Sequence, residues 1–248
     1  ESLGGGIAVT DFDLDGWPDL YLAQGAGRPS TGRGSASNKM LRNVSGRFHG
    51  VTRNSATEDF GYTQGIAVGD LNQDGFPDLV LGAIGKNRVL INNGDGTFRD
   101  RSDWLIGIED RFTTSVAIAD LNGDALPEII EVNYLDWDDA FAEPKQLPDG
   151  TYKIPGPANR EPEIDRWYEC SRDGRWQAQS FTVESRTGSG LGILVGELNG
   201  DPGNEIFIAN DARPNHFWMR GDNRWINAAD SLVTNFSNDP SNLYLRSE

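Results

Sequence analysis

An acidic segment occurs four times in this chain, and its repetition constrains the fold more than any other feature. The first copy, GIAVTDFDLDGWPDLYLAQG, sets four aspartates between two apolar runs. Three further copies follow the same pattern, and the four loops begin at Asp11, Asp70, Asp120 and Glu197. The intervals of 59, 50 and 77 residues suit repeated small sheets and not helical hairpins.

Each acidic loop lies between short runs rich in Val, Ile, Leu and Tyr, which are typical of strands. A second hairpin pattern follows at 38–52, 87–102 and 215–231, with turns of Gly, Asn and Asp that tolerate positive φ. In the third unit, we expect an altered second hairpin at 165–181. Four strands per unit make the blade of a β-propeller, so we predict an all-β fold of four-stranded antiparallel blades.

The predicted domain is a single propeller, or part of one, that spans residues 1–248. Its repeats are expected at about 4–62, 63–112, 113–189 and 190–241, with 242–248 as the first strand of a further blade, and inserts at 25–37 and 136–163. Either four blades close on themselves with 242–248 as a clasp, or the repeats are part of a larger ring. The larger ring is favoured, because four blades plus one unpaired strand would leave an exposed edge.

The spacing of the acids within a loop is typical of a site for a hard cation. Carboxylates at positions 1, 3, 5 and 9 in loop one, with glycine at position 6, repel one another unless water or a cation neutralises them. Residues 1, 3 and 5 point the same way, residue 7 offers a carbonyl, and the later acid closes the shell around Ca2+. The alternative is an acidic hairpin tip that binds no metal.

These motifs resemble a known family. DxDxDGxxD loops followed by NxLxxNxGDGTF hairpins look like the FG-GAP/VCBS repeats that build the β-propeller of integrin α-subunits and of many bacterial surface proteins. Within that group, VLINNGDGTFRD and FIANDARPNHFW resemble the propeller of cartilage acidic protein and its bacterial relatives. The resemblance implies a seven- or eight-bladed extracellular propeller with Ca2+ in its loops. It does not imply a reaction.

Carried over to this sequence, the resemblance gives four candidate Ca2+ loops. Loops one and two are complete: Asp11, Asp13, Asp15, Asp19 and the Trp17 carbonyl in loop one, and Asp70, Asn72, Asp74, Asp78 and the Phe76 carbonyl in loop two. Loop three offers Asp120, Asn122, Asp124 and Glu128, and loop four offers Glu197, Asn199, Asp201 and Glu205. Ala125 replaces the turn glycine in loop three, and Pro202 replaces it in loop four, so loop four is expected to bind metal least.

The charge of the chain excludes two classes of partner. The formal net charge is −16, and the four loops hold 13 of the carboxylates. No basic stripe is present to meet phosphates, which argues against nucleic acid and against anionic membranes. No stretch of about 20 apolar residues suitable for a membrane span occurs in the sequence either.

The main functional hypothesis is a calcium-binding, non-enzymatic scaffold that binds proteins or glycans in cell adhesion through its loops and inserts. Loops of this kind suit the Ca2+ concentrations found outside cells, so we expect an exported protein that is periplasmic, cell-surface or secreted. One alternative is a polysaccharide-active lyase or hydrolase, for which Asp138, Asp139, Glu163 and Asp165 are the only candidate carboxylates. Another is a structural subunit of a larger surface assembly, associated through an open propeller edge.

Two minor features have alternative interpretations. Trp137, Trp167, Tyr168 and Trp176 could form an aromatic binding platform, but aromatic residues in strands are more often core. Asn43 and Asn235 fit the pattern for N-glycosylation, which matters only in a eukaryotic source.

Overall fold

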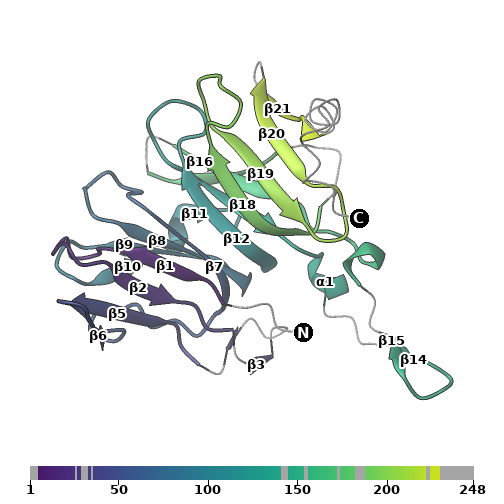
Figure 1. Cartoon of the computed structure of the whole chain (residues 1–248), viewed down its shortest axis with the longest axis horizontal. Coiled ribbons are helices and arrows are strands. Elements are labelled where there is room, and N and C mark those ends of the chain that lie inside the picture. The colour runs from purple at the N-terminus through teal and green to yellow at the C-terminus, as the bar shows by residue number, and fades with distance from the viewer. Residues whose placement is uncertain are drawn as a thin grey trace, which may run out of the picture.

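The computed structural model describes residues 5–25, 27–28, 33–34, 36–140, 145–153, 156–171, 174–181, 188–221 and 224–229. Four antiparallel groups of four strands follow one another along the chain (Figure 1), and we number them blades 1 to 4. The prediction of an all-β fold built from four-stranded blades is therefore confirmed, and the arrangement is consistent with part of a propeller. The expected strand 242–248 and Asn235 lie outside the described residues. The repeat bounds and the number of blades in a complete ring stay predictions.

Blades 1 and 2 each run through the sheet in chain order. Blade 1 consists of β1 (Ile7–Thr10), β2 (Asp19–Leu22), β5 (Lys39–Val44) and β6 (Arg47–Gly50). Blade 2 consists of β7 (Tyr62–Gly69), β8 (Asp78–Gly85), β9 (Arg88–Asn92) and β10 (Phe98–Asp100). Their outer hairpins, β5–β6 and β9–β10, are the two that the sequence predicts here.

Blades 3 and 4 repeat the plan. Blade 3 consists of β12 (Arg111–Ala119), β13 (Glu128–Asn133), β16 (Arg166–Cys170) and β17 (Trp176–Ser180). Blade 4 consists of β18 (Gly190–Gly196), β19 (Glu205–Asn210), β20 (His216–Gly221) and β21 (Arg224–Asn227). The altered hairpin expected at 165–181 is confirmed as β16–β17.

Blades 2 and 3 are joined into one sheet. The end of β8 pairs with the start of β12 at Gly85–Arg111 and Ile84–Phe112. After a short 3-10 helix, η2 (Ser102–Trp104), strand β11 (Leu105–Ile106) pairs in parallel with β17 at the outer edge of blade 3. The inner strands approach closely here, since a Cβ on Gly65 would lie 2.8 Å from the Cα of Ser115. Backbone hydrogen bonds thus connect blade 2 to the first strand of blade 3, and the segment that follows blade 2 to the last strand of blade 3.

The inserts carry short elements of their own. The first contains the hairpin β3 (Gly27–Arg28) and β4 (Arg33–Gly34). The second contains α1 (Trp137–Ala140), the hairpin β14 (Lys145–Gln146) and β15 (Tyr152–Lys153), and η3 (Pro157–Asn159). Figure 1 shows the β14–β15 hairpin projecting from the body of the sheets.

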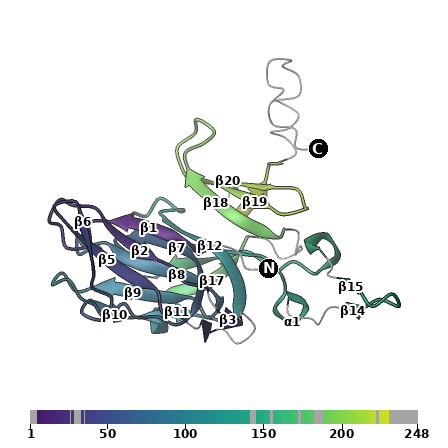
Figure 2. The same cartoon turned by 60° about the horizontal axis from the view of Figure 1, so that its bottom comes forward.

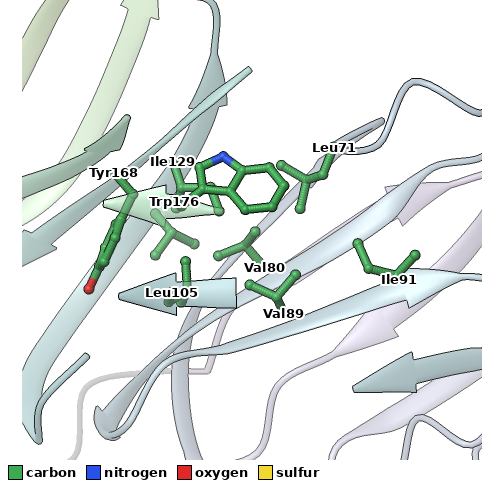
Figure 3. Packing of buried hydrophobic residues seen from close by; sticks show 9 residues of the cluster. Leu71, Val80, Val89, Ile91, Leu105, Ile129, Tyr168 and Trp176 are labelled. Carbon is green, nitrogen blue, oxygen red and sulfur yellow. The ribbon is translucent and has the colours of Figure 1, made fainter. Parts of the chain in front are cut away.

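The core lies between successive blades, because alternate residues of a strand point to opposite faces of its sheet. We define the front face of a blade as the face turned to the next blade in the chain, and the back face as the one turned to the preceding blade. Figure 3 shows the layer between blades 2 and 3, in which Val80 and Val89 meet Ile129, Tyr168 and Trp176. Each fully buried side chain of this kind stabilises the fold by about 1.5–3 kcal/mol.

Three of the four candidate platform aromatics belong to this core. Tyr168 and Trp176 pack between blades 2 and 3, and Trp167 packs between blades 3 and 4. Trp137 lies on α1 and is partly exposed. The core interpretation therefore holds for the three strand residues.

Candidate metal centres

Loop one joins β1 to β2 and is folded by its own carboxylates. Asp11 accepts hydrogen bonds from the amides of Asp15, at 3.0 Å, and Gly16, at 2.8 Å. Asp15 accepts one from the amide of Trp17 at 3.0 Å. Gly16 adopts a φ of +88°, which a side chain would disfavour, so the glycine allows the chain to wrap around Asp11.

The donor set of loop one fits a hard cation. Asp11, Asp13 and Asp15 each bring one carboxylate oxygen to within 4.8 Å of the others. The Oδ1 atom of Asp13 is buried and has no hydrogen-bond partner among the described residues. Buried acceptors are nearly always satisfied, and clustered carboxylate oxygens are the ligands that Ca2+ prefers. These residues would hold the ion, which would neutralise their mutual repulsion when bound.

Loop two, between β7 and β8, repeats this geometry. Asp70 accepts from the amides of Asp74, at 3.0 Å, and Gly75, at 2.8 Å, and Asp74 accepts from the amide of Phe76 at 3.0 Å. Gly75 has a φ of +89°. Asn72 donates its side-chain amide to Asp74 at 2.9 Å, so a carbonyl oxygen at the third position is held beside the carboxylates.

The acid at position 9 is buried beneath each loop and accepts the amide of the second loop residue. The distances are 3.1 Å from Phe12 to Asp19, 2.9 Å from Leu71 to Asp78, 2.7 Å from Leu121 to Glu128 and 2.8 Å from Leu198 to Glu205. In the first two blades, the other oxygen accepts an amide from the third strand, Asn43 to Asp19 at 2.7 Å and Asn92 to Asp78 at 2.8 Å. The position-9 acid thus ties the loop to the outer hairpin, a structural duty that the sequence alone does not reveal.

Burial makes these acids costly to ionise. Desolvation, aided by repulsion from Asp70 and Asp74 and opposed by the two backbone amides, raises the pKa of Asp78 to about 6. Desolvation likewise raises the pKa of Glu128 to about 7. A cation in the loop would favour the charged form and lower both pKa values.

Loop three keeps its form despite the missing glycine. Ala125 adopts a φ of +68°, and Asp120 still accepts its amide at 2.9 Å. Asp124 accepts the amide of Leu126 at 2.9 Å, as in the first two loops. Ala125 thus takes the place of the turn glycine, at a cost of about 1–2 kcal/mol in backbone strain.

Loop four departs further. Glu197 accepts the amide of Gly200 at 2.5 Å, and Asn199 accepts that of Asp201 at 2.6 Å. Pro202 has no amide hydrogen, so the bond that position 6 donates to position 1 in the other loops cannot form. The backbone of loop four therefore folds less completely around its first acid, Glu197. Loop four is also the loop that the sequence predicts to bind metal least.

Comparison with known proteins bears on these loops. The sequence model of the FG-GAP-like repeat matches residues 11–81 and 70–130. Residues 11–130 carry FG-GAP-like repeats. The chain is 32% identical to human integrin alpha-6 over 125 residues, which is 47% of the chain and 11% of that protein. It is 34% identical to human integrin alpha-7 over 96 residues, which is 37% of the chain and 8% of that protein. It is 32% identical to Gallus gallus integrin alpha-6 over 98 residues, which is 38% of the chain and 9% of that protein.

The chain therefore spans about a tenth of the length of these curated relatives. Blade 4 lies beyond the residues that the repeat model matches, yet it repeats the strand order of the preceding blades and their acid at position 9. None of the helices in the described ranges is long and apolar enough to cross a membrane.

Arg42 distinguishes the first FG-GAP-like loop from the others. Its guanidinium, carried by β5, forms ion pairs with Asp13 at 2.5 Å and with Asp15 at 3.0 Å. Strand register aligns Arg42 with Ile91, Glu169 and Met219 in the other blades, none of which is positive. A positive side chain therefore lies beside the loop-one oxygens that are expected to bind the ion. Sequence reasoning missed this contact, because only the pairing of β5 with β2 brings Arg42 to the loop.

We expect Arg42→Ala to tighten Ca2+ binding at loop one roughly three- to tenfold, because each exposed ion pair that the ion must replace is worth about 0.2–1 kcal/mol. Calorimetric titration of an Asp74→Ala background, in which loop two is disabled, isolates the effect. Arg53→Ala removes the same charge beside Glu58, away from the loops, and is the matched control. Equal affinities in the Arg42 and Arg53 variants would show that Arg42 does not compete with the ion.

Three of the four carboxylates named for the enzyme alternative are engaged in contacts within the fold. Glu163 pairs with Arg111 at 2.8 Å, and Asp165 accepts the amide of Asn133 at 2.8 Å with His216 Nδ1 at 3.7 Å. Both acids are buried, whereas Asp138 is exposed on α1 and Asp139 accepts the amide of Glu161 at 2.7 Å. Glu163, Asp165 and Asp139 thus tie the insert and the blades together, which is a structural role.

The glycosylation interpretation of Asn43 is wrong for the folded chain. Its side chain is buried, and its amide nitrogen donates to the carbonyl of Pro18 at 3.0 Å. The nitrogen that would carry a glycan is therefore hydrogen-bonded beneath the first loop.

Proposed function

We propose that this chain is a segment of a calcium-binding β-propeller that acts as a non-enzymatic scaffold for adhesion. The observation that carries the calcium proposal is the buried Oδ1 of Asp13, without a hydrogen-bond partner inside a loop of three converging carboxylates. Ca2+ would join the groups that each loop already brings together and fix the turn between the first two strands of a blade. The rim of the blades would then present a rigid surface.

The adhesion part of the proposal rests on the FG-GAP-like repeats and on the similarity to integrin alpha chains. Partners would be proteins or glycans bound by loops and inserts on the rigid sheets, as is usual for binding sites. The β14–β15 hairpin is a candidate contact, since Leu147 and Tyr152 are exposed on it. An exported location, periplasmic, cell-surface or secreted, follows as part of the same proposal. The closer resemblance to cartilage acidic protein rests on two motifs and stays a prediction.

The test is a calorimetric Ca2+ titration of the chelator-stripped chain, with thermal unfolding followed in parallel. We expect at least two sites, and stabilisation of about 1.4–2.7 kcal/mol per site at 10 mM Ca2+ if the dissociation constants are about 0.1–1 mM. Asp13→Ala with Asp74→Ala should abolish binding at loops one and two and most of the stabilisation.

The control removes two acids that lie outside the loops, Glu58→Ala with Asp103→Ala; Glu58 pairs with the exposed Arg53, and Asp103 pairs with the partly exposed Arg101. This variant carries the same change in charge and should still bind Ca2+ like the original chain. If the original chain takes up no Ca2+ at millimolar concentration, the calcium proposal fails and the loops are acidic turns.

A further inference from the structure

Asn92, the last residue of β9, connects the acidic loops of two blades. Its side chain is buried, and its amide nitrogen donates to the carbonyl of Phe12, in loop one, at 2.8 Å. The same nitrogen donates to the carbonyl of Pro77, in loop two, at 3.2 Å, and the side-chain oxygen accepts the amide of Gly94 at 2.9 Å. Both polar atoms of this side chain thus have partners, which fixes its orientation.

The carbonyl that Asn92 binds belongs to the peptide that leads into Asp13. The amide of Phe12 is held as well, because it donates to Asp19 at 3.1 Å. The ring of Phe12 is buried where the front face of blade 1 packs on blade 2, and Figures 1 and 2 show these two blades side by side. The backbone before Asp13 is therefore fixed by one contact from its own blade and one from the next blade. Asp13 carries the buried Oδ1 atom on which the calcium proposal rests.

A second junction repeats this contact. Strand register aligns Asn92 with Arg220 of blade 4 and with Cys170 of blade 3. Arg220 donates from Nη1 to the carbonyl of Leu121 at 3.4 Å, and Leu121 holds the second position in loop three, as Phe12 does in loop one. The thiol of Cys170 is only a weak donor. At two of the three junctions between the described blades, the later blade thus binds the second carbonyl of the preceding loop.

A backbone that is already fixed favours binding of an ion. The three carboxylates of loop one repel one another when no ion is bound, which favours opening of the loop. A contact that keeps the loop closed reduces the ordering that binding must supply, and this raises the affinity. Because the donor is Asn92, part of this ordering comes from blade 2 and not from loop one itself.

We infer that Asn92 is a positioning residue for the ion of loop one. It holds the peptide between Phe12 and Asp13, so that Asp13 is placed for the ion before the ion binds. This inference rests on the proposed calcium function. It implies that loop one reaches its full affinity only when blade 2 is folded against it.

Calorimetric Ca2+ titration in the Asp74→Ala background, in which loop two is disabled, tests this role. We expect Asn92→Ala to weaken binding at loop one roughly three- to tenfold, the effect of losing one hydrogen bond. Asn93→Ala is the matched control, because Asn93 is the exposed neighbour and donates to Thr97 within its own turn at 3.0 Å. Since Asn92 is buried, Asn92→Ser is a second variant that removes less volume, and the same loss is expected for it.

Amide hydrogen exchange in chelator separates positioning from a general loss of stability. In Asn92→Ala, peptides that contain residues 11–17 should exchange roughly three- to tenfold faster than in Asn93→Ala. Peptides that contain residues 120–126, in loop three, should exchange alike in the two variants. Equal acceleration of both segments would show that Asn92 supports only the stability of the chain, and would overturn the positioning role.

The titration distinguishes failure of this role from failure of the calcium proposal. If the Asp74→Ala chain takes up Ca2+ and the Asn92 and Asn93 variants bind it equally, only the role of Asn92 is overturned. If the original chain takes up no Ca2+ at millimolar concentration, the calcium proposal fails, and the positioning role fails with it.

Discussion

Asp78→Ala is expected to lower the free energy of unfolding by about 3–5 kcal/mol, because each of two buried amides left without an acceptor costs about 1–3 kcal/mol. Asp78 is fully buried, and its two oxygens accept the amides of Leu71 and Asn92. Urea denaturation in chelator should show this loss even though no Ca2+ is present. Asp78→Asn, which keeps the shape and one acceptor, should lie between the original chain and the alanine variant.

The matched control is Asp74→Ala in the same loop. Asp74 is exposed, so its removal should change stability in chelator by no more than about 1 kcal/mol. In Ca2+, Asp74→Ala should in addition lose the stabilisation that the ion confers on loop two. If Asp78→Ala costs no more than Asp74→Ala in chelator, Asp78 does not hold the loop to the outer hairpin.

Arg111→Met is expected to cost about 3–5 kcal/mol, since it leaves buried carboxylates without their counter-ion. Arg111 is buried at the start of β12 and lies 2.8 Å from Glu163 and 3.7 Å from Glu131. Glu131 also accepts hydrogen bonds from Asn87 of blade 2 at 2.7 Å and from Tyr168 at 3.0 Å. Burial raises the pKa of Glu131, and Arg111 opposes that rise.

Urea denaturation of three variants separates this network from ordinary surface charge. Arg53→Met removes an exposed ion pair with Glu58 and should cost less than about 0.5 kcal/mol. Adding Glu131→Gln to Arg111→Met should restore part of the loss, because it removes one of the uncompensated charges. Arg111 would have no such role if its variant matched Arg53→Met, or if the second substitution made the loss larger.

Much of the fold could be predicted because its signals are local. The alternation of apolar residues in runs such as IAVG and DLVLG, and the glycines that turn the loops, indicate strands and hairpins without knowledge of their neighbours. Loops one and two have the same hydrogen bonds because those bonds are local too: Asp11 and Asp70 accept the backbone amides four and five residues further on. Whether those loops bind Ca2+ remains a prediction.

The features that sequence reasoning missed depend on contacts across strands or between blades. Arg42 reaches Asp13 and Asp15 only because β5 pairs with β2. In the sequence, Arg42 and Asp15 lie 27 residues apart. The sequence offers Glu163 and Asp165 only as candidate catalytic acids, but the fold buries them against Arg111 and His216. The parallel pairing of β11 with β17 joins segments about 70 residues apart, and a two-residue strand has too little periodicity to reveal it.

The pairing of β8 with β12 has a consequence for how such chains evolve. Repeats joined only by side-chain packing can be duplicated, deleted or exchanged one at a time, with each new junction repacked by a few substitutions. Here the backbone ladder runs from blade 2 into blade 3, and Asn87 reaches Glu131 across the same boundary. A repeat inserted or removed between these two blades would break these main-chain hydrogen bonds unless the new neighbour offered a strand edge in the same register. We therefore expect gains or losses of a single repeat to be tolerated at the other junctions before this one.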